Sequence, residues 1–289
     1  MTKQIVLKLL REHTEEFLSG EAISRQAGVS RAAVWKAVEQ LRQEGYGIES
    51  VPNRGYRLTR VTARLRPEEL SEQFRDRRIG RELLCFDTID STNNELKRRA
   101  VSGTVDGTVI LADQQTGGRG RLGRSFQSPR GTGLYLSALL RPSLPPQEVV
   151  DFTAWVAVAV CDGIQAACGV RPRIKWTNDI YAGDKKLVGI LIEHSYSGQT
   201  LARTIVGIGI NVNQTEFDPA LPNPVSMAMV AGRTFDRGEV LEAFRRHIGI
   251  RYAQLELDER ETLQRDYRER MYRLGERHTF RYPDGTPTE

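Results

Sequence analysis

The sequence predicts an α+β protein with a small N-terminal domain of helices and a hairpin, followed by a larger domain with a mostly antiparallel sheet. Over the first 45 residues apolar side chains recur at helical spacing between glycine breaks. Beyond residue 80, short apolar runs alternate with glycine-containing turns. The length of 289 residues allows about two domains. With 39% hydrophobic and 27% charged residues, the composition excludes a disordered chain or a collagen-like repeat.

The cysteines and the distribution of apolar residues indicate in which cellular compartment the protein functions. The three cysteines are odd in number and none lies in a Cys-x-x-Cys pair, which favours a reduced, cytoplasmic protein. The N-terminus carries too many charges for a signal peptide. The longest apolar stretch, residues 149–168, contains Asp151 and Asp162 and therefore reads as a buried helix. We expect no membrane role.

The N-terminal segment has the pattern of three helices and a turn between two short strands. We expect helices over residues 3–17 and over Glu21–Ala27, and a longer one from an N-cap at Ser30 to about Glu44. Two short strands follow, around a turn at residues 52–55. This arrangement resembles a winged helix-turn-helix domain.

In such a domain the helix that follows Ser30 enters the DNA major groove. The first 60 residues carry ten Lys/Arg and seven Glu, which is +3 of the net +5. This local excess favours DNA over the alternative, a small helical domain that binds another protein. The residues expected near DNA are Ser30, Arg31, Ala32, Trp35 and Lys36, with Arg54 and Arg57 from the wing.

The rest of the chain predicts a linker and then a mixed domain with its helices on one face of the sheet. After the linker we expect a short helix that starts at Pro67. The expected strands are residues 83–86, 108–112, 173–176, 187–193 and 204–211. The expected helices are residues 91–100, 149–168 and two within 236–274, the second highly charged with a solvated face. One final strand and a turn close the sequence.

One loop of the central domain is rich in glycine and arginine. Residues 117–131 contain five glycines, four arginines and no acidic residue. Glycines permit a close approach to a ligand, and guanidinium groups bind phosphate or carboxylate. The loop does not match the P-loop pattern Gly-x-x-x-x-Gly-Lys-Ser/Thr. By composition alone it could also be a nucleic-acid-binding patch.

Five motifs occur in order and together resemble the biotin protein ligases. They are Asp90-Ser91-Thr92-Asn93, Gln115 with Gly118-Arg119-Gly120-Arg121, Lys175-Trp176-Thr177-Asn178-Asp179, Lys186 to Leu191, and Gly207 to Asn211. With the N-terminal domain, the chain resembles the bifunctional biotin ligases that also repress the biotin operon. It departs from the family pattern at Thr177, which is usually Pro, and at Phe126, which is commonly Trp.

The resemblance implies a fold and a reaction. The fold is a winged helix-turn-helix domain (1–62), a class II synthetase-like catalytic domain (63–270) and the incomplete start of an SH3-like domain (271–289). Biotin attacks MgATP to give biotinyl-5′-AMP, and a lysine of the biotin carboxyl carrier protein of acetyl-CoA carboxylase then takes the biotin. The repressor would act on biotin synthesis or uptake genes, as a homodimer favoured by the adenylate.

The same resemblance implies the roles of the site residues. For Lys175 and the loop arginines there is also a physical reason, because their positive charge would stabilise the approach of a carboxylate to a phosphate. Lys175 and Arg121 are the expected catalytic residues, although Lys175 could simply be an exposed strand lysine. Biotin would contact Ser91, Thr92, Asn93, Gln115, Gly118, Arg119, Gly120, Arg121, Lys175 and Gly189. ATP would contact Arg119, Arg121, Arg124, Phe126, Asn178 and Asn211. No metal ligands are expected, since ATP carries the Mg²⁺. The rival functions are a lipoate ligase and a ligand-sensing repressor without catalysis.

Overall fold

The structure is a computed structural model, and it describes residues 2–13, 16–43, 46–60, 65, 78–142, 145, 149–257, 259–281 and 286–288. The chain divides into two compact units. One comprises Met1–Arg75 with Asp236–Gly238, and the other comprises Asp76–Phe235 with Glu239–Glu289. The expected helix at Pro67 lies outside the described residues.

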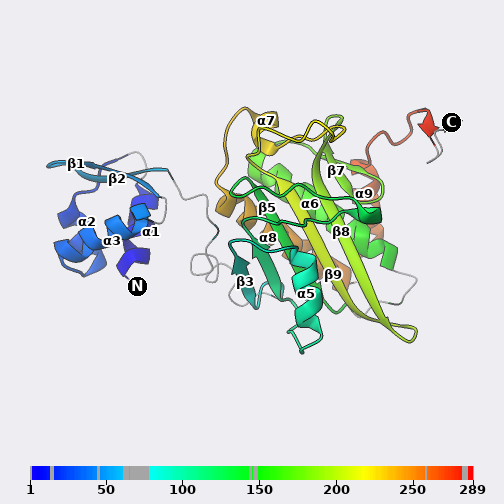
Figure 1. Cartoon of the computed structure of the whole chain (residues 1–289), viewed down its shortest axis with the longest axis horizontal. Helices are drawn as coiled ribbons and strands as arrows, with labels where there is room; N and C mark the ends of the chain where they lie inside the picture. Colours follow the sequence, from blue (N-terminus) through cyan, green and yellow to red (C-terminus); the bar gives the residue numbers. More distant parts are fainter. Residues whose placement is uncertain are drawn as a thin grey trace. The chain divides into compact units, whose positions relative to one another are not determined.

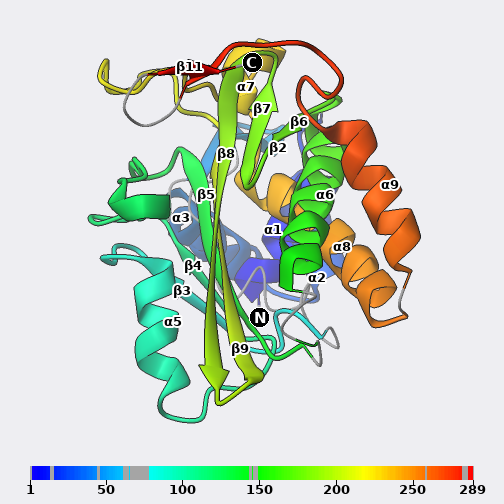
Figure 2. The same cartoon turned by 90° about the vertical axis from the view of Figure 1, so that its right-hand side faces the viewer.

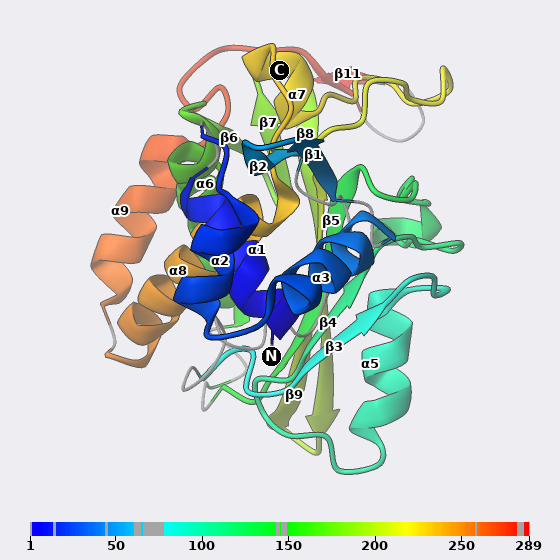
Figure 3. The same ribbon diagram turned by 90° about the vertical axis from the view of Figure 1, so that its left-hand side faces the viewer.

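The first unit is a winged helix-turn-helix domain, as the sequence predicts. Its elements are α1 (Thr2–Glu12), α2 (Gly20–Ala27), α3 (Arg31–Gln43), β1 (Gly47–Val51) and β2 (Gly55–Arg60), shown in blue in Figures 1 and 3. The strands form an antiparallel hairpin. The apolar faces of the helices meet in one core that includes Leu10, Ile23, Val38 and Leu41.

The first helix is shorter than its periodicity predicts. It ends at Glu12 rather than at residue 17. Leu18 instead exchanges two backbone hydrogen bonds with Tyr56 of β2, at 2.9 and 2.8 Å. This pairing brings Leu18 so close to Gly55 that an added Cβ there would lie 2.0 Å from the Leu18 carbonyl oxygen. Pairing with the wing therefore overrides the helical preference of this segment.

The second unit is built on a seven-stranded sheet in the order β3-β4-β5-β9-β8-β7-β6. Strands β3 and β4 run parallel, and the other neighbouring pairs are antiparallel. The strands are β3 (Leu83–Phe86), β4 (Val109–Ala112), β5 (Gly133–Leu140), β6 (Arg173–Lys175), β7 (Asp179–Ala182), β8 (Lys185–Ser197) and β9 (Thr200–Asn211). A mostly antiparallel sheet is thereby confirmed.

Helices cover both faces of this sheet, so the prediction of helices on one face is wrong. Helix α5 (Thr92–Ala100) packs Leu96 and Ala100 against Ile110, Leu139 and Ile205 on one face. Helices α6 (Val149–Cys168), α8 (Arg237–Glu256) and α9 (Arg260–Arg270) lie on the other side (Figure 2). The short α5 covers only part of its face because its apolar residues are few, and this leaves room beside it for a loop.

Partly buried charges join the three helices of the second face. Asp162 of α6 accepts hydrogen bonds from Arg251 at 2.7 Å and from Arg270 at 2.8 Å. Arg251 also donates to Asp266 at 2.6 Å, and the side chains of Asp162 and Arg251 are each 12% exposed. Helix α9 is therefore bound through these charges and the buried Leu263, while Arg265, Arg268 and Glu269 on its other side are exposed, as its charged composition predicts.

The second unit also contains α7 (Met227–Ala231) and the 3-10 turn η1 (Arg121–Gly123). Toward the end of the chain, β10 (Phe280–Arg281) pairs with β11 (Pro287–Thr288), so there are two short strands where we expected one. In the described part of the chain, no helix is both long and apolar enough to cross a bilayer.

We expect Asp162→Asn to destabilise the protein by about 3 kcal/mol, because it leaves two largely buried guanidinium groups facing a neutral amide. Urea unfolding would measure the change. Arg268→Gln, on the exposed side of α9, serves as the control and should shift stability by no more than about 0.5 kcal/mol. Equal losses in the two variants would contradict the role of the cluster.

Candidate functional site

A row of residues crosses the α5 face of the sheet at one level. The strand register pairs Tyr135 with Gly209, Gly209 with Gly189, Gly189 with Asp179, and Asp179 with Lys175. Directly paired residues point to the same face. The row therefore has an aromatic at one end, two bare glycines in the middle and a lysine at the other end.

Phe126 lies on the glycine part of this row. A Cβ added to Gly209 would be 2.5 Å from the Phe126 ring, and one added to Gly189 would be 3.0 Å from it. The same ring meets Tyr135 edge-on, with centroids 6.5 Å apart. The Phe126 ring therefore packs against the backbone of the two paired glycines, and this contact attaches the Gly-Arg loop (residues 117–131) to the sheet.

The N-terminus of α5 is capped from outside the helix. Ser91 occupies the N-cap position but makes no side-chain capping hydrogen bond. Gln115 Oε1 accepts instead from the Thr92 amide at 2.9 Å and from the Thr92 hydroxyl at 3.1 Å. Gln115 Nε2 in turn donates to Ser128 at 2.9 Å. These bonds bring the first motif and the loop together.

Asn93 lies over the next level of the sheet. Ser137 donates to Asn93 Oδ1 at 2.5 Å, and Asn93 Nδ2 donates to Glu193 at 2.9 Å. A Cβ added to Gly207 would lie 2.1 Å from Asn93 Oδ1. Lys97 of α5 pairs with the other oxygen of Glu193 at 2.6 Å. Burial opposes ionisation of Glu193, but hydrogen bonds from Lys97 and Asn93 outweigh it, so its pKa lies below the usual range.

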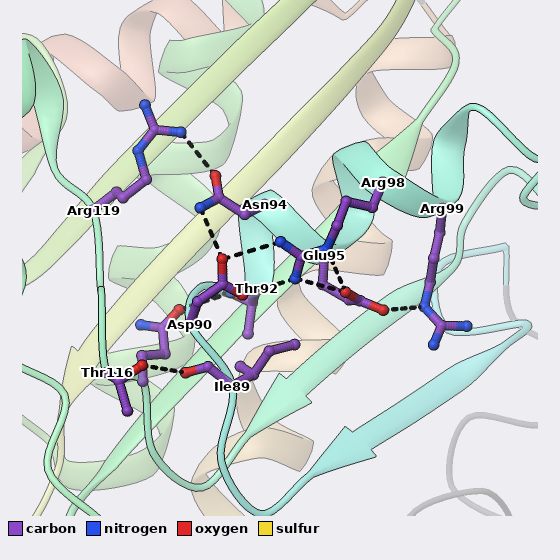
Figure 4. Close-up of polar contacts among 10 residues, drawn as sticks. Ile89, Asp90, Thr92, Asn94, Glu95, Arg98, Arg99, Thr116 and Arg119 are labelled. Carbon is purple, nitrogen blue, oxygen red and sulfur yellow. Dashed lines mark hydrogen bonds and ion pairs between the residues drawn. The ribbon is translucent and has the colours of Figure 1, made fainter.

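Arg119 of the loop contacts the exposed side of α5. It donates to Asn94 Oδ1 at 2.9 Å, and Asn94 donates to Asp90 at 3.1 Å (Figure 4). Asp90 is held by both terminal nitrogens of Arg98, at 3.0 and 2.7 Å. The hydrogen bonds from Arg98 keep the pKa of Asp90 well below its usual range. Glu193 lies 3.5 Å from the same Arg119 nitrogen.

Arg121 reaches the other side of the site. Its guanidinium donates to the Thr177 hydroxyl and, at 3.1 Å, to Asn178 Oδ1. Asn178 is tied to β8, since its side chain donates to the Ile190 carbonyl at 2.6 Å. The loop is thus held between α5 and the turn that follows Lys175.

Lys175 is an exposed residue at the end of β6. Its Nζ donates to the Tyr181 hydroxyl at 3.1 Å and lies 5.0 Å from the centre of that ring. Of the two apolar neighbours in the sequence, Ile174 is fully buried, whereas Trp176 is 72% exposed and lies beyond the strand. Of these two neighbours, only Ile174 is packed in the core, so it anchors the backbone of β6 next to Lys175.

Two of the expected nucleotide contacts lie in different places: Asn211 is outside the Gly-Arg loop, whereas Arg124 is part of it and its carbonyl accepts from the Gly120 amide at 2.7 Å. Asn211 is buried and donates to the Val225 carbonyl at 3.0 Å. Arg124 is exposed at the end of η1. Gly118 and Gly120 do belong to the loop base, where Phe126 and Gly120 each make a backbone hydrogen bond across it. A Cβ on Gly118 would lie 2.3 Å from the Phe126 carbonyl oxygen.

The N-terminal unit presents one exposed stripe of α3. Ser30 caps this helix by accepting from the Ala33 amide at 3.2 Å. The exposed residues of the stripe are Arg31, Ala32, Trp35, Lys36 and Gln40. On the wing, Arg54 and Arg57 lie 4.5 and 4.6 Å from the Phe17 ring centre, and Arg57 also pairs with Glu49 at 2.7 Å. A phosphate would compete with Glu49 for Arg57.

Comparison with known proteins agrees with this arrangement. A model of the biotin/lipoate A/B protein ligase family matches residues 85–211, and an HTH domain model matches residues 2–57. The bifunctional ligase/repressor BirA of Bacillus subtilis (strain 168) is 39% identical over 240 residues, which are 82% of this chain and 74% of that protein. The chain belongs to the BirA family of bifunctional ligase/repressors.

Other members support the same relationship. BirA of Escherichia coli (strain K12) is 31% identical over 86% of this chain and 75% of its own length. Among solved structures, the biotin protein ligase from Aquifex aeolicus in complex with biotin and ATP has a TM-score of 0.59 and 31% identity. That match covers 67% of this chain and 80% of the other.

Two polar residues of this BirA-family site lie outside the sequence motifs. Ser137 and Glu193 both contact Asn93, yet each stands in or next to a run of apolar strand residues. A polar side chain in such a run is the signal that could have identified them. Among the residues that the structure describes, no group of three or more His, Cys, Asp or Glu could hold a metal ion.

We expect Glu193→Gln to lower the stability at neutral pH by about 1 kcal/mol, because it removes the charge that faces Lys97. Since the pKa of Glu193 is lowered on folding, this stabilisation exists above the ordinary carboxyl range and is lost as the pH falls through the lowered pKa. Urea unfolding at several pH values should show the two curves converging in acid. A difference that is constant with pH, or equal to that of the exposed Glu216→Gln, would contradict this assignment.

Proposed function

We propose that this chain activates biotin with ATP to biotinyl-5′-AMP and transfers the biotin to a lysine of the biotin carboxyl carrier protein of acetyl-CoA carboxylase. One observation carries the proposal. The Gly-Arg loop is held over the sheet face on which Lys175 lies, with Arg121 bound to the turn two residues beyond that lysine. Positive charge is therefore gathered on one side of the sheet, where in this proposal the two anions would meet.

The chemistry needs this charge. A carboxylate that attacks the α-phosphate of ATP repels it, and negative charge builds up on the phosphate as the bond forms. The Lys175 ammonium, oriented by Tyr181, would bridge the two groups, and the Arg119 and Arg121 guanidinium groups would bind the phosphate oxygens. The Mg²⁺ in the proposal arrives with ATP and shields the triphosphate.

The polar end of α5 suits a neutral, hydrogen-bonding ring such as the ureido group of biotin. Ser91, Thr92 and Asn93 are nearly fully buried, and together with Gln115 they supply both donors and acceptors without a net charge. We propose that the backbone of Gly118 and Gly120 lines the ligand, whereas Gly189 contributes by leaving space for the Phe126 ring. On the nucleotide side, we propose that Phe126 stacks on adenine, with Arg124, Asn178 and Asn211 in supporting positions.

We expect Lys175→Ala to reduce the rate of pyrophosphate release from biotin and ATP by about 10²–10³-fold, since it removes a charge used in the transition state. A coupled pyrophosphate assay measures this. The exposed Lys185→Ala should retain the wild-type rate.

If Lys175→Ala formed the adenylate at the wild-type rate, the catalytic role proposed for this lysine would be wrong. No pyrophosphate from the wild type with biotin would favour a sensor without catalysis. Calorimetric titration with biotin and with lipoate separates the two ligase substrates, and tighter binding of lipoate would overturn the biotin assignment.

The N-terminal unit supports a second function, repression of biotin synthesis or uptake genes through operator DNA. The exposed stripe of α3 supplies Arg31, Trp35 and Lys36 to a major groove, and the wing supplies Arg54. We propose that the adenylate favours a homodimer, which would offer two such helices to a palindromic operator. In the part of the chain that the structure describes, Cys85, Cys161 and Cys168 form no disulfide bond, which supports a cytoplasmic setting.

We expect Arg31→Ala to weaken binding to a mixed-sequence DNA duplex and to reduce the slope of log K against log salt by about 1. Fluorescence anisotropy at several salt concentrations would measure both. Lys8→Ala, exposed on α1, is the matched control and should leave the slope unchanged. Identical slopes in wild type and Arg31→Ala would place this residue outside the DNA interface.

A further inference from the structure

Tyr181 holds the ammonium group of Lys175 and is itself almost completely buried. Lys175 of β6 pairs with Asp179 of β7, and Tyr181 lies two positions further along β7, on the same face. The Lys175 Nζ donates to the Tyr181 hydroxyl at 3.1 Å, whereas Asp179 pairs with Lys186 at 2.7 Å. Asn223 donates to the same hydroxyl at 3.4 Å. Tyr181 is 4% exposed, so the position of its hydroxyl depends on what packs around its ring.

Tyr272 packs against this ring from the segment that follows α9. The centres of the two tyrosine rings lie 5.3 Å apart, and their planes make an angle of 46°. The backbone of the segment is attached to β6, because the Tyr272 amide donates to the Ile174 carbonyl at 2.8 Å and Met271 forms a parallel bridge with Ile174. The segment therefore carries the Tyr272 ring to the edge strand that bears the proposed catalytic lysine.

Asp184, in the turn between β7 and β8, fixes the orientation of Tyr272. Its carboxylate accepts from the Tyr272 hydroxyl at 2.5 Å and from the Arg273 guanidinium at 3.1 Å. The hydrogen bond from Tyr272 is the main cause that lowers the pKa of Asp184, so this acceptor is charged at neutral pH. The Arg273 guanidinium also lies 4.9 Å from the centre of the Tyr272 ring. Tyr272 is thus held at its hydroxyl by Asp184 and at its ring by Tyr181 and Arg273.

We propose that Tyr272 is a positioning residue, whose ring keeps the Tyr181 hydroxyl in the place where it holds the Lys175 ammonium. In the proposed function, on which this inference rests, Lys175 bridges a carboxylate and a phosphate. A displaced ammonium would stabilise the transition state less, because this stabilisation depends on a preorganised geometry. Tyr272 acts through Tyr181 and does not itself touch the reacting atoms.

The test uses single variants of the full chain. Tyr272→Leu removes the ring that packs against Tyr181, whereas Tyr272→Phe keeps this ring and removes only the hydroxyl. Tyr196→Leu, which replaces an exposed tyrosine of β8, is the matched control. Urea unfolding checks that each variant is folded.

The first readout does not depend on activity. The lysines of each folded variant are reductively dimethylated with ¹³C-formaldehyde, and the NMR signal of Lys175 is identified by its loss in Lys175→Arg. The Tyr181 ring, whose centre lies 5.0 Å from the Lys175 Nζ, should displace this signal from those of other exposed lysines. We expect the signal to move toward those lysines in Tyr272→Leu and to keep its wild-type position in Tyr272→Phe and Tyr196→Leu.

The second readout is the steady-state rate of pyrophosphate release from biotin and ATP. We expect kcat to fall about 5-fold in Tyr272→Leu and to stay within about 2-fold of the wild type in Tyr272→Phe, with little change of KM for either substrate. Tyr196→Leu should keep the wild-type kcat. Since Tyr272 acts through the Tyr181 hydroxyl, Tyr272→Leu combined with Tyr181→Phe should be no slower than Tyr181→Phe alone.

An unmoved Lys175 signal in Tyr272→Leu would overturn the positioning of Lys175. A moved signal with an unaltered kcat would overturn its catalytic consequence, and additive losses in the double variant would overturn the route through Tyr181. Should the wild type release no pyrophosphate, the proposed function fails, and the NMR signal still decides whether Tyr272 positions Lys175.

Discussion

The bare strip of sheet at the paired residues Gly189 and Gly209 is the constraint on which the site depends. Without side chains there, the Phe126 ring can lie against the backbone of β8 and β9. A methyl group at Gly209 would lie 2.5 Å from that ring, far inside van der Waals contact. The ring seats the part of the Gly-Arg loop that carries Phe126, and Arg119 and Arg121 are then fixed by their own partners on α5 and on the turn after Lys175.

A further glycine, Gly207, leaves space for a side chain two residues earlier on β9 than Gly209. Gly207 leaves the space that Asn93 fills, and Asn93 then connects α5 to Ser137 and Glu193 on two different strands. Helix α5 is short and its core cluster is small, so these polar bonds fix its N-terminal end. The site and the packing of α5 are consequently one structural unit.

Charge is distributed unevenly over the two faces of the sheet. On the far face, Asp162 compensates the guanidinium groups of Arg251 and Arg270 and thereby joins three helices. On the site face, Arg121 is held by neutral oxygens, and Arg119 has an amide oxygen closer than Glu193. Compensated charge stabilises the scaffold, whereas charge held by neutral acceptors remains available for an anionic ligand.

The local chemistry of the sequence determined a large part of this protein. The winged helix-turn-helix unit, five of the seven strands of the large sheet and the long helix at residues 149–168 follow from periodicity, caps and glycine breaks, because these act within a few residues. Strands β5 and β7 were not predicted. The motif residues Lys175, Arg119 and Gln115 could be selected as well, since their order along the chain is specific. Their roles in the proposed reaction await the experiments above.

Tertiary structure alone decided what depends on distant segments. Helix α1 ends early because Leu18 pairs with Tyr56, and α5 is capped by Gln115 rather than by Ser91. Helices α6, α8 and α9 pack on one face of the sheet and α5 packs on the other, and no local sequence pattern determines which face a helix covers. The contact of Arg121 with Thr177 spans 56 positions, so only the folded sheet could bring these residues together.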